Sequence, residues 1–133
     1  MAKRTSKPPP ALHELEAEIM EHVWSHPGEL TVRDVMEALN RKANPARAYT
    51  TYMTVMRRLN DKDILERKRI GPRDTYAARL TRDEYQEQRA DAEVRQLVDE
   101  FGDVALAHFA RSLSGLDPAR REALQRLADG DPD

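Results

Sequence analysis

Hydrophobic residues recur at helical spacing in three successive stretches of the first half of the chain. In each stretch the apolar positions follow the i, i+3, i+4, i+7 pattern of one buried helix face. The stretches cover residues 12–26, 31–42 and 47–62. Pro27-Gly28 and Asn44-Pro45 separate them, because glycine and proline end helices. The pattern therefore predicts three helices that share one core.

The period changes after residue 63. Residues 64–70 and 75–80 are short extended runs, and Gly71-Pro72-Arg73-Asp74 between them is a turn signal. These runs predict a two-stranded hairpin, and Glu29-Leu30 is a further short extended link. Three helices followed by a basic hairpin is the order of a winged helix, in which the second and third helices form the helix-turn-helix.

Residues 81–129 are helical again, but each segment has only one narrow apolar stripe. Thr81 and Glu84 form a capping-box pattern at the start of a long helix, Gly102 interrupts it, and Asp117-Pro118 begins a last helix. Such helices cannot close a core alone, so we expect a two-fold homodimer. The residues expected at the dimerisation surface are Tyr85, Leu97, Phe101, Val104, Phe109, Leu113, Leu124 and Leu127.

The expected fold class is mainly α with a small β-hairpin (α+β). A winged helix-turn-helix domain spans residues 12–80, and a helical dimerisation region spans residues 81–129. Residues 1–11 carry three cations and three consecutive prolines, which is typical of a flexible basic arm. The arm could add contacts to phosphates. The simpler interpretation is that it is a disordered leader. Residues 130–133 are expected to be a frayed tail.

Composition excludes several classes of function. The chain has no cysteine, which rules out disulfides and thiolate metal sites. No apolar run approaches a membrane span and none follows the basic N-terminus, so we expect a cytoplasmic protein without membrane insertion. No phosphate-binding glycine loop, nucleophile elbow or His-Glu zinc motif is present. We therefore expect neither an enzyme nor a cofactor.

The net charge of −2 conceals an uneven distribution. Residues 41–80 hold eleven Lys and Arg against four Asp and Glu, a balance of +7. Residues 81–133 hold seven Lys and Arg against thirteen Asp and Glu, a balance of −6. The basic middle indicates contact with a polyanion, and the acidic C-terminal third indicates a different task.

The outward face of the third predicted helix suggests what that polyanion is. It carries short hydroxyls followed by cations, whereas a merely solvated helix in so charged a chain would carry Glu and Lys. Threonine is a mediocre helix former, so three threonines on an exposed face do not serve to stabilise the helix. They indicate instead that this face contacts a DNA groove. The residues of this face are Thr50, Thr51, Met53, Thr54, Arg57 and Arg58.

Six further residues complete the predicted DNA-binding set. They are Thr31, Arg33, Tyr49, Lys68, Arg69 and Arg73. Threonine can read bases, whereas the Arg and Lys side chains are expected to hold phosphates. Alternatives stay open for single residues: any one cation could be simply solvated, Tyr49 could be a packing residue, and Thr31 could cap the second helix.

Glu18, His22 and His26 stand at i, i+4, i+8 and could place three metal ligands on one helix edge. No fourth ligand is nearby, and paired histidines at this spacing are common on solvated faces. We therefore expect no metal site.

Three stretches resemble the BlaI/MecI family of penicillinase repressors. They are Leu15-Glu-Ala-Glu-Ile-Met-Glu-His-Val-Trp24, Thr31-Val-Arg-Asp-Val35 and Ala48-Tyr-Thr-Thr-Tyr-Met-Thr-Val-Met-Arg-Arg-Leu59. The resemblance implies a winged-helix repressor that binds a dyad operator in double-stranded DNA as a homodimer. It places the recognition helix on Thr50, Thr51, Met53, Thr54 and Arg58, and the wing on residues 68–73. In some members a membrane sensor protease pathway ends in cleavage of the repressor.

Three positions depart from that family's pattern. Tyr52 stands where a smaller aliphatic residue is usual, and Asp63 replaces a common glycine where a left-handed backbone is required. The nearest match to the cleaved Asn-Phe bond is His108-Phe109, which puts proteolytic induction in question. The copper-responsive branch uses C-terminal cysteines, which this chain lacks.

Two functions from different classes follow from the sequence. The first is a dimeric repressor that binds DNA sequence-specifically. The second is a winged-helix module that docks an acidic protein partner without specific DNA binding. The hydroxyl-and-arginine face favours the first, because a protein-docking groove would show more exposed apolar residues.

Overall fold

The computed structural model describes residues 8–130, and the chain divides into two compact units, Met1–Ala90 and Asp91–Asp133. The elements are mainly helical with one antiparallel hairpin, so the predicted α+β class is confirmed. The division lies ten residues beyond the predicted domain boundary. The first unit extends further because the start of the long C-terminal helix packs into its core.

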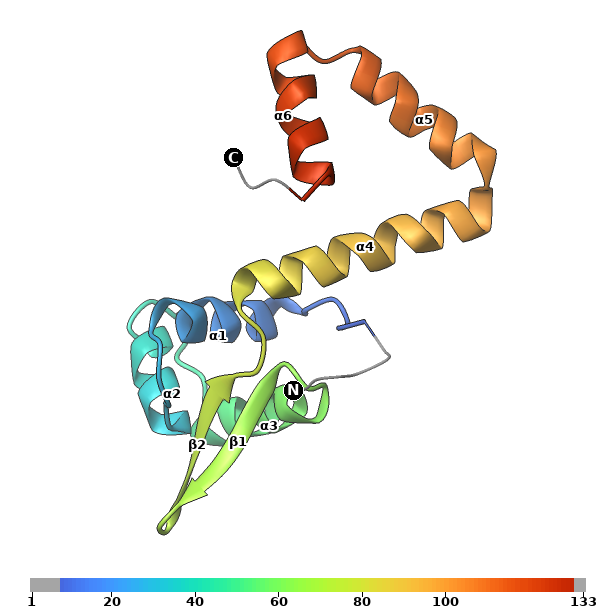
Figure 1. Cartoon of the computed structure of the whole chain (residues 1–133). Coiled ribbons are helices and arrows are strands. Elements are labelled where there is room, and N and C mark those ends of the chain that lie inside the picture. Colours follow the sequence, from blue (N-terminus) through green and yellow to red (C-terminus); the bar gives the residue numbers. More distant parts are fainter. Residues whose placement is uncertain (1–7, 131–133) are drawn as a thin grey trace. The chain divides into compact units, whose positions relative to one another are not determined.

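The first unit follows the predicted order of three helices and a hairpin (Figure 1). Its elements are α1 (Glu14–Ser25), α2 (Val32–Asn40), α3 (Tyr49–Asp61), β1 (Leu65–Ile70), β2 (Arg73–Ala78) and the first turns of α4 (Arg82–Phe101). Thr31 and Asp34 exchange the two 3.0 Å hydrogen bonds of a capping box at α2. Thr81 and Glu84 do the same at α4, so both predicted helix starts are confirmed.

The hairpin is tighter than the sequence suggested. β1 and β2 pair from Leu65↔Ala78 to Ile70↔Arg73, which leaves only Gly71-Pro72 in the turn. Gly71 has φ +62°, a conformation that glycine adopts at little cost. The predicted four-residue turn was too long because Arg73 and Asp74 already belong to β2. The extended link also pairs, since Leu30 and Tyr76 form an antiparallel bridge.

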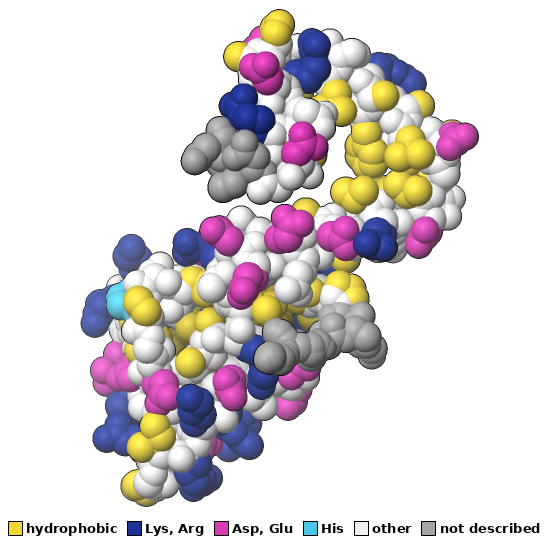
Figure 2. Space-filling view, viewed as in Figure 1, with side chains coloured by type: hydrophobic (Ala, Val, Ile, Leu, Met, Phe, Trp, Pro, Cys, Tyr) yellow, Lys and Arg dark blue, Asp and Glu magenta, His cyan; other side chains and the backbone are white. Residues whose placement is uncertain are grey.

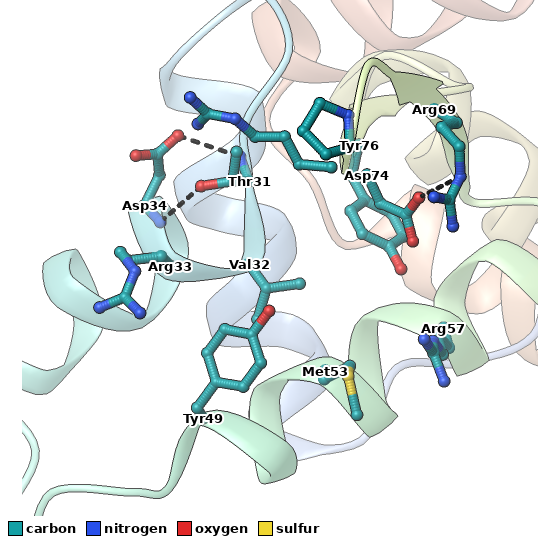
Figure 3. A pocket seen from close by; sticks show the side chains of 12 residues that line it. Thr31, Val32, Arg33, Asp34, Tyr49, Met53, Arg57, Arg69, Asp74 and Tyr76 are labelled. Atoms are coloured by element: carbon teal, nitrogen blue, oxygen red, sulfur yellow. Dashed lines mark hydrogen bonds and ion pairs between the residues drawn. The ribbon is translucent and has the colours of Figure 1, made fainter.

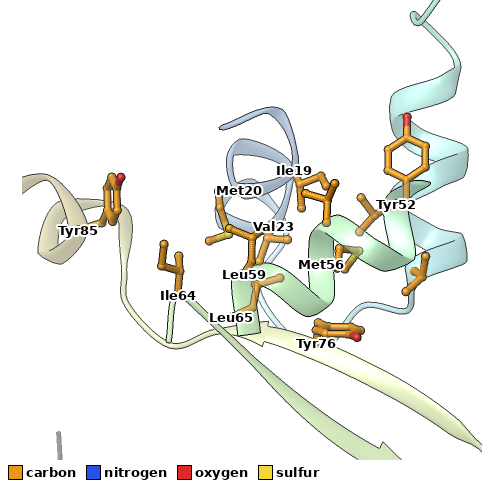
Figure 4. Packing of buried hydrophobic residues seen from close by; sticks show 13 residues of the cluster. Ile19, Met20, Val23, Tyr52, Met56, Leu59, Ile64, Leu65, Tyr76 and Tyr85 are labelled. Atoms are coloured by element: carbon orange, nitrogen blue, oxygen red, sulfur yellow. The ribbon is translucent and has the colours of Figure 1, made fainter. Parts of the chain in front are cut away.

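The core of the first unit lies between the three helices and the base of the hairpin (Figure 4). The predicted stripe of α3 is buried: Tyr52, Met56 and Leu59 are fully enclosed, and Val55 is 8% exposed. Burial of this stripe is the main stabilising contribution in such a small domain. The Tyr52 hydroxyl donates a 2.8 Å hydrogen bond to Asn40 Oδ1, so the larger residue seats without an unsatisfied polar group.

The backbone after α3 has the expected left-handed residue. Asp63 has φ +64° and is the sole non-glycine residue with positive φ among residues 8–130. This geometry reverses the chain, so that Ile64 and Leu65 enter the core directly after α3. The sharp reversal places β1 beside α3.

The start of α4 and the end of the N-terminal segment both differ from expectation. Tyr85 was assigned to the dimerisation surface, but it is 8% exposed within the first unit and lies 5.6 Å from the Trp24 ring. Its hydroxyl donates a 2.7 Å hydrogen bond to the Pro10 carbonyl, and burial raises the pKa of this phenol. Arg89 donates to the Pro9 carbonyl at 3.0 Å, and Pro9 is buried.

Pro9 and Pro10 are therefore held against the first unit, which corrects the prediction of a flexible arm at these two positions. Pro9 is buried, and the carbonyls of Pro9 and Pro10 accept hydrogen bonds from α4, whereas Pro8, Pro10 and Ala11 remain exposed. The basic residues of the predicted arm, and most of the predicted frayed tail, lie outside the described residues.

The second unit contains the end of α4, α5 (Asp103–Ser114) and α6 (Pro118–Ala128). Gly102 joins α4 and α5 with φ +59°, and Asp117 caps α6 by accepting a 2.9 Å hydrogen bond from the Arg120 amide. Ala105 is the sole buried residue of this unit within the described range. None of the helices in residues 8–130 is both long and apolar enough to cross a membrane.

Large apolar side chains remain exposed on the second unit. Figure 2 shows them gathered over α4 and α5. The exposed set includes Val94, Leu97, Phe101, Val104, Leu106, Phe109, Leu113 and Leu127. Seven of the eight residues predicted at the dimerisation surface lie on this unit, and Tyr85 is the exception.

Candidate nucleic-acid interface

The outward face of α3 is open to solvent. Thr50, Thr51, Thr54, Arg57 and Arg58 are exposed. Tyr49 is 43% exposed at the start of the helix, and Met53 is half-buried. Hydroxyls therefore occupy the first two turns of this face and guanidinium groups the next turn, as the sequence predicted.

A groove runs beside this face between α3, the start of α2 and the hairpin (Figure 3). From α3 it takes Tyr49, Met53 and Arg57, which are spaced by four residues along one edge of the helix. The groove has a volume of about 360 Å³ and is lined by Thr31, Val32, Arg33, Asp34, Tyr49, Met53, Arg57, Arg69, Pro72, Arg73, Asp74 and Tyr76. Seven of the twelve predicted DNA-binding residues thus meet in one place. The threonines of α3, Arg58 and Lys68 lie outside its lining.

The hairpin is held against α3 by specific contacts. The side-chain oxygen of Asn60, near the end of α3, accepts a 3.0 Å hydrogen bond from the Arg67 backbone amide of β1. Tyr76 of β2 is 1% exposed and packs against the core under the groove. The wing is therefore a fixed wall of the groove.

Two of the three predicted wing cations already have acidic partners. Arg69 Nε lies 3.5 Å from an Asp74 carboxylate oxygen, and Lys68 Nζ lies 3.4 Å from Glu29. In contrast, Arg57, Arg58 and Arg73 form no ion pair with any residue between 8 and 130. These three arginines are the cations of the site that a phosphate could engage without displacing a carboxylate.

The start of α2 shows whether Thr31 caps the helix, which the sequence left open. The Thr31 hydroxyl accepts the Asp34 amide, so this side chain caps the helix. Arg33 is exposed and lies 4.0 Å from Glu37 on the same helix, which is a weak surface pair. The capped start of α2 still borders the groove, where helix amides favour an anion.

Glu18, His22 and His26 do not converge as a ligand set. Glu18 is engaged by Arg47 at 3.3 Å, and the two imidazole rings stack with centroids 4.2 Å apart. Burial lowers the pKa of His22, and the positive neighbours His26 and Arg41 lower it further. No group of three ligand-type side chains able to hold a metal occurs in residues 8–130.

The acidic residues beside the site were not apparent from the sequence. Asp74 was assigned to the turn, but the strand register places it directly opposite Arg69. Glu29 was assigned only to the link, yet it contacts Lys68 and accepts a 3.0 Å hydrogen bond from the Thr75 hydroxyl. The correct turn length would have revealed the first pairing, because it fixes the register of the hairpin.

The bond between His108 and Phe109 lies inside α5. His108 is exposed, and Phe109 is 36% exposed. A protease needs an extended substrate, so cleavage at this bond would require local unwinding of the helix.

The chain is similar to known penicillinase repressors and transcriptional regulators. A family model described as penicillinase repressor matches residues 12–130. The transcriptional regulator BlaI of Mycobacterium tuberculosis, in strains CDC 1551 / Oshkosh and H37Rv, is 36% identical over 122 residues, which are 90% of this chain and 86% of that protein. The similarity covers the winged-helix unit and the C-terminal helices together. The chain belongs to the penicillinase repressor family.

Proposed function

We propose that this chain is a dimeric transcriptional repressor that binds a dyad operator in double-stranded DNA. The observation that carries the proposal is the exposed hydroxyl-and-arginine face of α3 beside a groove with unpaired arginines. A helix of this kind fits the major groove, and a hairpin beside it reaches the flanking backbone. The family and the mycobacterial relative, which is named as a transcriptional regulator, support the same function.

The roles divide along α3. Thr50, Thr51 and Thr54 are short enough to let the helix backbone approach base edges, where a hydroxyl or methyl group can discriminate bases. Arg57 and Arg58 lie one turn further and are assigned to phosphates, which set affinity and register. Arg73 on the hairpin is assigned to phosphates of the DNA backbone beside the groove that α3 enters.

Dimerisation through the second unit supplies the second half-site. One recognition helix reads only a few base pairs, so selectivity in a genome requires two. The apolar side chains left exposed on α4 and α5 support this assignment, since monomers rarely leave so many uncovered.

The proposal is tested by titrating the protein against duplex DNA at several salt concentrations. For a dimer with several phosphate contacts per subunit, log affinity should fall with log salt with a slope of about −5 or steeper. A fluorescence-anisotropy titration measures this directly. A flat slope, or no binding to any genomic fragment, would refute the repressor and favour the protein-docking module.

The division of roles gives a second prediction. Thr54→Ala should reduce the ratio of operator to random-DNA affinity by about fivefold or more, because a base contact is worth about 1–3 kcal/mol. Arg57→Ala should weaken binding to both DNAs about equally, since phosphates carry no sequence information. Competition assays on the two variants measure both ratios. If Arg57→Ala changed the ratio and Thr54→Ala did not, the assignment would be reversed.

A further inference from the structure

A carboxylate lies among the cations of the proposed DNA-binding groove. Asp74 lies opposite Arg69 in the strand register, and Arg67 is two residues along the same strand, so all three side chains share one face of the hairpin. The carboxylate oxygens of Asp74 lie 3.5 Å from Arg69 Nε and 3.9 Å from Arg67 Nη1. Figure 3 shows the Arg69–Asp74 pair on the wall of the groove.

The exposure of the three side chains shows how they are layered. The Asp74 side chain is 21% exposed, whereas Arg67 and Arg69 are 42% and 71% exposed. The carboxylate therefore lies deeper, and the guanidinium groups extend from it toward solvent. A DNA phosphate that approached the wing would meet both arginines with part of their charge already neutralised.

We propose that Asp74 is a positioning residue that occupies the wing arginines in place of phosphate and thereby limits sequence-independent affinity for DNA. The inference rests on the proposed DNA-binding function. Sequence-independent binding depends on cations that replace counterions along the backbone, so an internal carboxylate competes for the same charges. The carboxylate also orders the two long side chains, which fixes where a phosphate would bind.

The test compares the full chain with Asp74→Asn on a random-sequence duplex across several salt concentrations. The variant should bind about fivefold more tightly, and its log–log salt slope should be steeper by about one per subunit, because one more cation in each subunit is available to phosphate. Asp74→Glu keeps the charge and should bind as the wild type does. If Asp74 had a purely structural role, Asp74→Asn would bind DNA more weakly than the wild type, because the wing would be disordered.

Asp91→Asn is the matched control for net charge. It removes one carboxylate from an exposed arginine, Arg95, 2.8 Å away on α4 and outside the groove. Its affinity should stay within about twofold of the wild type. The inference would be overturned if Asp91→Asn gained as much DNA affinity as Asp74→Asn. It would also be overturned if the DNA affinity of Asp74→Asn were unchanged or lower than that of the wild type. If the wild type itself bound without salt dependence, the proposed function would fail instead.

Discussion

A chain truncated after Ala90 is expected to sediment as a monomer and to bind a dyad DNA site about 10²-fold to 10⁴-fold more weakly than the full chain. The second unit has only Ala105 buried within its described residues and carries the exposed apolar side chains of α4 and α5. Removing it should therefore remove the contact between subunits. Each half-site is then bound without the effective concentration that a tethered partner supplies.

The position of the cut matters. A chain ending at Leu80 would lose Tyr85, which packs beside Trp24 in the core of the first unit, and would risk unfolding. Circular dichroism should show that the chain ending at Ala90 still melts cooperatively. Phe101→Ser with Phe109→Ser in the full chain is the matched variant, because it removes apolar surface and keeps the length. A stable dimer of the truncated chain would refute the C-terminal assignment.

Lys62→Ala is expected to lower the free energy of unfolding by about 3 kcal/mol at about pH 7. Glu16 of α1 is 1% exposed, and its carboxylate accepts hydrogen bonds from Lys62 Nζ at 2.7 Å and from the His13 amide at 2.9 Å. Removing the ammonium group leaves a buried carboxylate with one partner. The pair also joins the start of α1 to the residue that follows α3, so its loss loosens the support of α3.

The pH dependence distinguishes this cause from lost packing. Burial raises the pKa of Glu16, but the His13 amide and Lys62 together lower it below its ordinary value of 4.5. A lowered folded-state pKa stabilises the wild type above the unfolded-state value, and this contribution is lost as pH falls through the folded-state value. Without Lys62, burial is opposed by His13 alone, so the pKa of Glu16 rises.

The loss in free energy of unfolding caused by Lys62→Ala should therefore become smaller as the pH falls toward the ordinary pKa of a glutamate. Urea unfolding at several pH values measures it. Glu16→Gln combined with Lys62→Ala is the control, because it removes the buried charge and should recover part of the loss. A deficit that is constant with pH would assign the effect to packing of the lysine stem.

Much of the fold was predictable because its signals are local. The stripe of Tyr52, Val55, Met56 and Leu59 follows from helical periodicity, and the Thr31–Asp34 and Thr81–Glu84 capping boxes need only four consecutive residues. The left-handed residue at position 63 was expected from the resemblance to the family, in which a glycine is common there, and not from a local signal.

The sequence alone placed the exposed threonines and arginines of α3, since a helix with one buried stripe presents the rest to solvent. It could not place the partners that join distant segments. Asp74 with Arg69, and Glu16 with Lys62, depend on the turn length and on how α1 packs against α3. Local periodicity contains no information about such pairs.

By itself, the sequence determined the helices, their buried faces, the order of a winged helix and the exposed hydroxyl-and-arginine face of α3. The tertiary structure alone decided that Tyr85 belongs to the core of the first unit, that Pro9 is buried, and that Arg67 and Arg69 of the hairpin face a carboxylate. The physical reason is that secondary structure follows from neighbouring residues, whereas burial and charge pairing depend on which surfaces the folded chain brings together.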